Sequence, residues 1–367
     1  MKPPVSSYAV STPASGPGLR RQIEATLRDW LMTGRYGAGD QLPPAREIAR
    51  ECGDVNEQTV RRALKNLMNE GLLRGAQGKG VFVSSTGARY KRVALVLPNL
   101  EDETTQLIAR GARRVFDTQG FQTLILDAQR DSDQERVHLA TLPDLPVDGT
   151  IIFPVAYGDI AECILRLKLD GMSLVLVDKY CPGIKVDCVV ADDYQGAYAL
   201  TTALIAKGRR RIAWLDGEAG STTVENRFDG YRWALGDQCL PVERALVRRM
   251  KLPSPTSPYV MALEGEIKAL LELAKAPDGL VCANDLLAVA AVDFLRARGV
   301  RVPEDIGVAG FGDLRMAVDP DFITTVHTPL ELMGERAAQL LLKRIQSKKA
   351  EAETIVLPVQ VILRRST

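Results

Sequence analysis

Histidine is scarce in this sequence, and cysteine is present without any pairing pattern. The chain has two histidines, His138 and His327, and six cysteines that form no C-x-x-C pair. Zinc sites and disulfide frameworks both need such residues at characteristic spacings. The sequence therefore argues against either, and we expect buried free thiols and no bound metal.

Motifs typical of enzymes are also missing. There is no G-x-S-x-G, no H-E-x-x-H, and no G-x-G-x-x-G after the first strand of the α/β region. The glycines between Gly75 and Gly80 lack the following helix that a P-loop needs. Because nothing singles out a catalytic base or nucleophile, we expect a binding protein without a cofactor rather than an enzyme.

Long apolar runs are lacking as well. No stretch approaches the length of a transmembrane helix. Residues 1–18 are rich in Pro, Ser, Gly and Ala and have no apolar core, so they fit neither a signal peptide nor a membrane anchor. We expect a disordered tail over residues 1–18 and a cytoplasmic protein without membrane partners.

The charge is nearly balanced overall but unevenly distributed. The whole chain carries a net charge of +1, whereas residues 19–92 hold 14 Lys and Arg against 8 Asp and Glu. A basic segment joined to an acidic remainder fits a nucleic-acid-binding module with a regulatory partner domain, although a charge difference alone is often only a solvated surface.

Residues 42–83 show the pattern of a winged helix-turn-helix. Two short amphipathic helical patterns are followed by two β-prone runs around a glycine turn. The second pattern has Val60 and Leu64 on its apolar side, Asn56 as an expected N-cap and Gly71 as an expected stop. Its other faces are left polar and cationic, as a helix in a DNA major groove requires.

The segment from Leu19 to Val83 resembles the DNA-binding domain of the GntR family of bacterial repressors. Its matching strings are Gly34 to Pro43, Val55 to Leu64, Glu70-Gly71-Leu72 and Gln77 to Val83. In that family an Arg commonly stands where this chain has Glu57. An acid there repels phosphate or accepts from cytosine N4, so the family's base contact is not carried over to this position.

The predicted DNA contacts lie on the second helix and on the glycine turn after it. The residues that these two segments offer are Asn56, Gln58, Thr59, Arg61, Arg62, Lys65, Gln77 and Lys79. The resemblance assigns a DNA contact to Arg61 and adds Arg46, at the start of the first helix of the pair. A solvated surface Arg is the competing interpretation of Arg46.

After the winged region, at 19–84, and a small, polar, basic linker at 85–92, the sequence texture changes. Short apolar runs alternate with helical patterns, which predicts parallel sheets covered on both faces, in an α/β core over residues 93–367. The runs are Val93 to Leu97, Phe121 to Leu126, Gly149 to Phe153, Leu174 to Val177, Ile212 to Leu215, Gly279 to Cys282 and Ile306 to Gly310. The length suits two lobes better than one.

This second region resembles the effector-binding core of the LacI/GalR repressors, which is itself similar to periplasmic sugar-binding proteins. The matching strings include Val147-Asp148-Gly149, Leu176-Val177-Asp178, Asp192-Asp193, Arg227 to Tyr231, Ala283-Asn284-Asp285 and Val302 to Phe311. The resemblance implies an N-lobe at about 93–192 and 327–356, and a C-lobe at about 193–326 and 357–367. A GntR-type head on such a core is also similar to arabinose-responsive repressors.

The family-matched positions supply candidate ligand contacts in Asp178, Arg227, Asn284, Asp285 and Asp313. A hydroxyl-rich ligand needs carboxylate or amide acceptors and rigid donors of this kind. Asp285 equally fits a role in fixing its loop. Asp313 stands one residue after Gly312, which occupies the family's Asp position. Trp233 is expected to pack against a sheet.

We therefore expect a homodimeric transcription regulator that binds an operator in double-stranded DNA and responds to a small effector, with a sugar as the expected class. Repression is the leading expectation. A ligand-dependent activator is the alternative, and a solute-binding protein for import is disfavoured by the basic head and the missing export signal.

Overall fold

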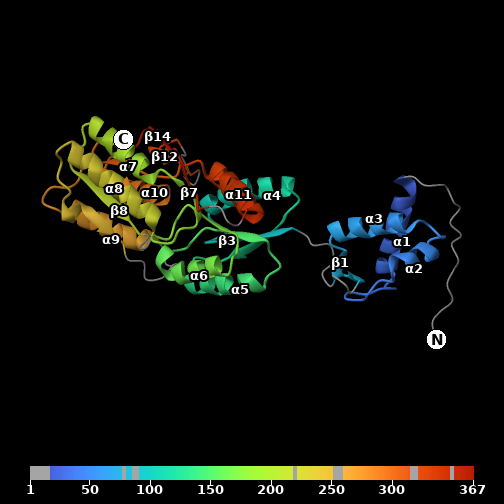
Figure 1. Cartoon of the computed structure of the whole chain (residues 1–367). Coiled ribbons are helices and arrows are strands. Elements are labelled where there is room, and N and C mark those ends of the chain that lie inside the picture. Colours follow the sequence, from blue (N-terminus) through green and yellow to red (C-terminus); the bar gives the residue numbers. More distant parts are fainter. Residues whose placement is uncertain are drawn as a thin grey trace. The chain divides into compact units, whose positions relative to one another are not determined.

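Figure 1 shows the computed structural model, which describes residues 17–76, 80–84, 91–217, 221–250, 259–314, 321–347 and 351–367. The chain divides into two compact units, Met1–Tyr90 and Lys91–Thr367. Among the described residues, no helix combines the length and apolarity needed to cross a bilayer. The cysteines are free, and Cys239 is exposed, so the expectation of burial is wrong for that thiol.

The N-terminal unit is a winged helix-turn-helix, as predicted. Its elements are α1 (Pro17–Met32), α2 (Ala45–Glu51), α3 (Glu57–Asn69), β1 (Leu73–Ala76) and β2 (Gly80–Val83). The apolar stripe of α3, with Val60 and Leu67 fully buried, packs against α1 and α2. β1 and β2 form an antiparallel hairpin in which Leu73 faces Val83.

Both ends of α3 are fixed by the residues that the sequence indicated. The side-chain oxygen of Asn56 accepts a hydrogen bond from the backbone N–H of Gln58 at 2.8 Å. Gly71 has a φ of +77°, a left-handed conformation that glycine adopts without steric cost. The N-cap and stop predictions are confirmed, so the start and direction of α3 are set locally.

The second unit contains a six-stranded parallel sheet, here called the N-lobe sheet, in the order β13-β7-β6-β5-β3-β4. Its strands are β3 (Arg92–Leu97), β4 (Gln122–Asp127), β5 (Gly149–Ile152), β6 (Leu174–Val177), β7 (Asp187–Ala191) and β13 (Thr354–Leu357). The helices around it are α4 (Glu103–Thr118), α5 (Ser132–Thr141), α6 (Tyr157–Leu169) and α11 (Leu330–Gln346).

Alternate strand residues of this sheet join different apolar clusters. Val93 and Leu95 pack with α4 and α11, whereas Ala94 and Val96 pack with α5 and α6. A strand buried on both faces reads as a continuous apolar run, and this explains why the sequence pattern found it.

A four-stranded parallel sheet, in the order β11-β10-β8-β9, forms the C-lobe sheet. Its strands are β8 (Ile212–Asp216), β9 (Val247–Arg249), β10 (Gly279–Cys282) and β11 (Gly307–Ala309). The helices of the lobe are α7 (Asp193–Ala206), α8 (Thr222–Asp237), α9 (Tyr259–Leu271) and α10 (Asp285–Ala297). Helix α7 packs on α8, and α9 on α10.

The chain passes between the two lobes at three places. These lie between β7 and α7, between β12 (Thr325–His327) and α11, and between β13 and β14 (Gln360–Ile362). β12 and β14 pair as an antiparallel ribbon, with Val326 opposite Val361. The two-lobed fold with parallel sheets is therefore the predicted one, and each lobe is assembled from segments far apart in the sequence.

Helices α4 and α11 touch through glycines. A Cβ atom placed on Gly111 would lie 2.0 Å from the carbonyl oxygen of Glu331, and one placed on Gly334 would lie 2.0 Å from that of Ile108. Neither helix has room for a larger residue at the crossing. The backbones approach closely because both positions lack a side chain.

Candidate DNA-binding and ligand-binding sites

One face of α3 carries the side chains predicted to meet DNA. The exposed ones are Gln58, Arg61, Arg62 and Lys65. Thr59 is half-buried, and Asn56 uses its side-chain oxygen for the cap. The exposed face thus offers amide and cationic groups, which are the donors that bind base edges and phosphates.

Arg46 lies in the first turn of α2 and is exposed. Within the described part of the chain, Arg46, Arg62 and Lys65 form no hydrogen bond or ion pair. Their charges are therefore available to an external anion. Gln77 and Lys79, predicted at the tip of the hairpin, lie outside the described residues.

Arg61 is already paired. Its guanidinium lies 3.1 Å from the carboxylate of Glu57, one helical turn earlier, and both side chains are exposed, by 70% and 44%. The residue at which this sequence departs from the family pattern thus contacts a residue that the resemblance assigns to DNA. Sequence comparison flagged Glu57 but not this contact.

Asp178 follows β6 in a left-handed conformation with a φ of +67°. Its backbone oxygen accepts a hydrogen bond from the Thr223 hydroxyl at 3.2 Å, and the backbone N–H of Tyr180 donates to the Thr222 hydroxyl at 3.2 Å. Both threonines belong to α8 in the C-lobe. This predicted ligand residue therefore lies where the two lobes touch.

Arg227 is buried in the first half of α8. Its Nε donates to a carboxylate oxygen of Asp193 at 2.7 Å, and another guanidinium nitrogen donates to the carbonyl of Ala283 at 2.7 Å. The guanidinium also lies 3.8 Å from the centre of the Phe311 ring. The predicted role is ligand contact, but these contacts show that Arg227 also holds the C-lobe together.

The carboxylate of Asp193 is completely enclosed. Burial raises the pKa of Asp193 to about 7, the positive charge of Arg227 opposes that rise, and the negative charge of Asp178 adds to it. Asp193 therefore gains or loses its proton near neutral pH, and it forms an ion pair with Arg227 only when it is deprotonated.

Asn284 and Asp285 have local structural roles. The side-chain oxygen of Asn284 caps α10 by accepting from the backbone N–H of Leu287 at 3.0 Å. The buried carboxylate of Asp285 accepts from the Thr325 hydroxyl at 2.6 Å and from the backbone N–H of Leu314 at 2.9 Å. Burial raises the pKa of Asp285, and these two hydrogen bonds oppose the rise.

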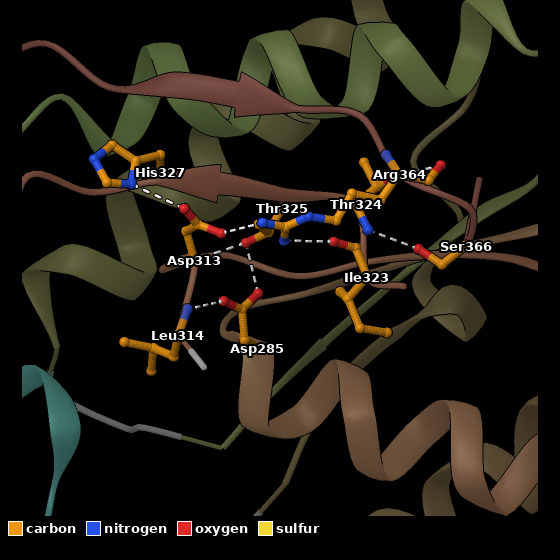
Figure 2. A network of polar contacts seen from close by, with 9 residues as sticks. All are labelled: Asp285, Asp313, Leu314, Ile323, Thr324, Thr325, His327, Arg364 and Ser366. Carbon is orange, nitrogen blue, oxygen red and sulfur yellow. Dashed lines mark hydrogen bonds and ion pairs between the residues drawn. The ribbon is translucent and has the colours of Figure 1, made fainter. Parts of the chain in front are cut away.

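Figure 2 shows the polar network around Asp313, which joins the loop after β11 to the ribbon between the lobes. One oxygen of Asp313 pairs with Arg364 at 2.6 Å, and the other lies 2.9 Å from Nδ1 of His327. Its backbone φ is +57°. Both oxygens of this predicted ligand residue thus have partners within the chain.

The five candidate ligand residues lie close to one another through a series of contacts. Asp178 accepts a hydrogen bond from Thr223, which lies one turn before Arg227 on α8. Arg227 in turn donates a hydrogen bond to the carbonyl of Ala283, the residue before Asn284. Asp285 bonds the residue after Asp313. The carboxyl ends of strands from both lobes therefore meet here, and ligands of open α/β sheets collect at such ends.

Sequence reasoning missed the partners of these residues and one hydroxyl beside them. Ser221, at the start of α8, is 1% exposed, and its hydroxyl has no hydrogen-bond partner among the described residues. Trp233 is 57% exposed, so the prediction that it packs against a sheet is wrong. On α8 the inward side is taken by residues such as Tyr231, and Trp233 falls on the outer side.

A cavity of about 1260 Å³ lies beside the crossing at Asp192 and Asp193. It runs along β7 and β13 and reaches Tyr194 and Asn226. None of the five candidate ligand residues is among its lining residues. Within the described ranges, no three His, Cys, Asp or Glu side chains are grouped to hold a metal ion.

Comparison with known families identifies both parts of the chain. Residues 19–83 match the family of bacterial regulatory proteins called gntR, and residues 201–367 match the periplasmic binding protein-like domain. The two matches fall in the two compact units. They agree with both resemblances inferred from the sequence strings.

Similar proteins of known role are transcription regulators. The regulator DegA of Bacillus subtilis is 27% identical over 90% of this chain and 95% of its own length. The arabinose metabolism transcriptional repressor of Geobacillus stearothermophilus is 28% identical over 94% of this chain and 96% of its own length. The structure of the regulator CelR in complex with cellobiose has a TM-score of 0.65 and 25% identity, and covers 87% of this chain and 95% of that one.

Proposed function

We infer that this chain, which joins a gntR-family DNA-binding domain to a periplasmic binding protein-like domain, is a transcriptional repressor whose DNA affinity is controlled by a small molecule. One observation carries the inference. The exposed face of α3 presents Arg62 and Lys65, both without a partner among the described residues, on the helix that a winged helix-turn-helix places in the major groove.

We propose that the effector is a neutral sugar or a related polyhydroxy compound. The candidate contacts for its hydroxyl groups are the carboxylate of Asp178, which already accepts from Thr223, the hydroxyl of Ser221, and the amide of Asn284, whose oxygen also caps α10. The buried hydroxyl of Ser221 has no partner among the residues that the structure describes, and such a group is one that a ligand can satisfy. Arabinose in the name of one relative and cellobiose in the structure of another support this class.

The proposed switch is a change in the angle between the lobes. Thr222 and Thr223 bridge to the loop after β6 in the arrangement described above. A ligand alters DNA binding only if it prefers one lobe geometry over the other, because equal affinity for both shifts nothing. We propose a homodimer, since one winged head makes too few contacts to select a site.

The test uses the full chain and a pool of duplex DNA with a randomised central region. Repeated selection should converge on a two-fold symmetric sequence, as expected for a dimer. A thermal-shift screen of arabinose, cellobiose and other sugars should then find a compound that raises the unfolding temperature by several degrees, because a ligand that binds only the native state stabilises it. That compound should weaken binding to the selected duplex about tenfold or more.

Different outcomes have different meanings. A pool that never converges contradicts sequence-specific DNA binding. A sugar that strengthens binding to the selected duplex contradicts release by the ligand and reverses the sign of the proposed control. If sugars have no effect on unfolding but another class of metabolite does, the proposed ligand class is wrong while the regulator remains.

A further inference from the structure

Among the charged side chains of α3, all but one are cationic. Glu57 is the only carboxylate in the sequence of this helix, EQTVRRALKNLMN, and it occupies the first position after the Asn56 cap. The first turn of the second helix of a helix-turn-helix is the part that faces the base edges. A single acid at that place, beside a polyanion, needs an explanation.

The structure shows how that negative charge is held. One oxygen of Glu57 pairs with Arg61, and the other accepts no hydrogen bond from a described residue. Arg61 has five N–H donors, so this pair leaves most of them free for DNA. The pair therefore presents an acceptor with an adjacent cation that offsets repulsion from phosphates.

Base chemistry limits what such an acceptor can recognise. In the major groove only cytosine N4 and adenine N6 offer N–H donors. Adenine also presents its N7 acceptor beside N6, and the lone pair of N7 repels a carboxylate that approaches there. Cytosine presents no acceptor on its major-groove edge. A carboxylate in the groove therefore favours cytosine.

We propose that Glu57 is a specificity-determining residue that reads a cytosine in each half of the binding site, with Arg61 as the residue that positions its carboxylate. The inference depends on the proposed DNA binding and adds a base identity to it. A purely structural role competes with it, because an acid at a helix N-terminus also interacts favourably with the helix dipole.

The experiment compares base preference in the full-length chain. Wild type and Glu57→Gln are each used to select duplexes from the same randomised pool, and single-base-pair changes are then measured by competition binding. Wild type should prefer C·G over the other base pairs at one position in each half site by about tenfold or more. Glu57→Gln should move that preference toward A·T, because an amide donates to adenine N7 and accepts from N6.

Glu51→Gln is the matched control. Glu51 is an exposed acid of the same unit that pairs with Arg35 at 2.6 Å, so both substitutions remove one negative charge and one exposed ion pair. Both variants should gain similar affinity for random DNA at low salt. Only Glu57→Gln should change the selected base. A purely structural role for Glu57 would change the unfolding temperature and leave the base preference unmoved.

The outcomes separate this inference from the proposed function. If wild type selects a site and Glu57→Gln selects the same site with equal discrimination, Glu57 does not read a base and the inference is overturned. If wild type selects no site, sequence-specific DNA binding itself fails. Glu57→Asp keeps the charge on a shorter side chain and should retain a weaker C·G preference. If Glu57→Gln fails to fold, the base preference of Glu57→Asp tests the inference in its place.

Discussion

The buried pair of Arg227 and Asp193 gives the sharpest test of the packing. Replacing Arg227 with Met keeps an unbranched side chain but removes the guanidinium, which bonds Asp193 and the carbonyl of Ala283 and lies on the ring of Phe311. In that variant the carboxylate of Asp193 would remain buried without its partner.

The size of the effect follows from these contacts. Removing one member of a buried ion pair costs about 3–5 kcal/mol of unfolding free energy. Protonation of Asp193, whose pKa is already raised to about 7, limits the cost at neutral pH, so we expect about 3 kcal/mol for Arg227→Met. Asp193→Asn keeps an acceptor for Nε and should cost about 1–2 kcal/mol. The double variant should lose about 2 kcal/mol less than the sum.

The assay is urea unfolding without ligand, monitored by tryptophan fluorescence. Trp214 reports on this lobe because its side chain is fully buried and packs on Phe228. Lys268→Met is the control, since Lys268 pairs with Glu272 at the surface of the same lobe, and it should change stability by less than about 0.5 kcal/mol. If the effects of Arg227→Met and Asp193→Asn add to that of the double variant within about 0.5 kcal/mol, the coupling between the two side chains is refuted.

Two further predictions follow from burial and close packing. Because burial raises the pKa of Asp193 to about 7, its contribution to stability is present at low pH and is lost as the pH rises through about 7. The unfolding free energy of the wild type should therefore fall by about 2 kcal/mol between pH 5 and pH 7. Asp193→Asn should remove this part of the pH dependence, as measured by urea titration at both pH values. Gly334→Ala should lower the unfolding free energy by about 1–3 kcal/mol because its Cβ would collide with a carbonyl oxygen of α4. The control is Gly265→Ala in α9, where a Cβ has open space, and it should raise the unfolding free energy by about 0.5–1 kcal/mol. Equal changes in the two variants would contradict the close contact between α4 and α11.

Local sequence patterns predicted most of the fold. Strands buried on both faces, such as β6 and β10, appeared as apolar runs with the predicted bounds, and α3 was fixed by its own cap and stop. β7 was missed because Asp187 opens it with a charge. That charge is balanced by Arg344 at 2.6 Å, from a segment 157 residues away, and no local pattern reveals such a partner.

The candidate site was only partly predictable for the same reason. Family-matched strings indicated which residues gather at the strand ends, but not what else they bind. Asp313 shows the difference, because its partner His327 lies in the ribbon between the lobes and its partner Arg364 follows that ribbon. Their sequence positions gave no sign of a shared carboxylate. The contact and specificity roles of the candidate residues stay predictions.

The way the chain is threaded through its two lobes affects how it can fold during synthesis. Strand β13 completes the edge of the N-lobe sheet beside β7, and α11 covers one of its faces, yet both are translated only after all four strands of the C-lobe sheet. A growing polypeptide therefore carries an unfinished apolar surface on its first lobe while the second is being made. Exposed apolar surfaces favour misassembly, so the nascent chain should depend on chaperones until both α11 and β13 have left the ribosome.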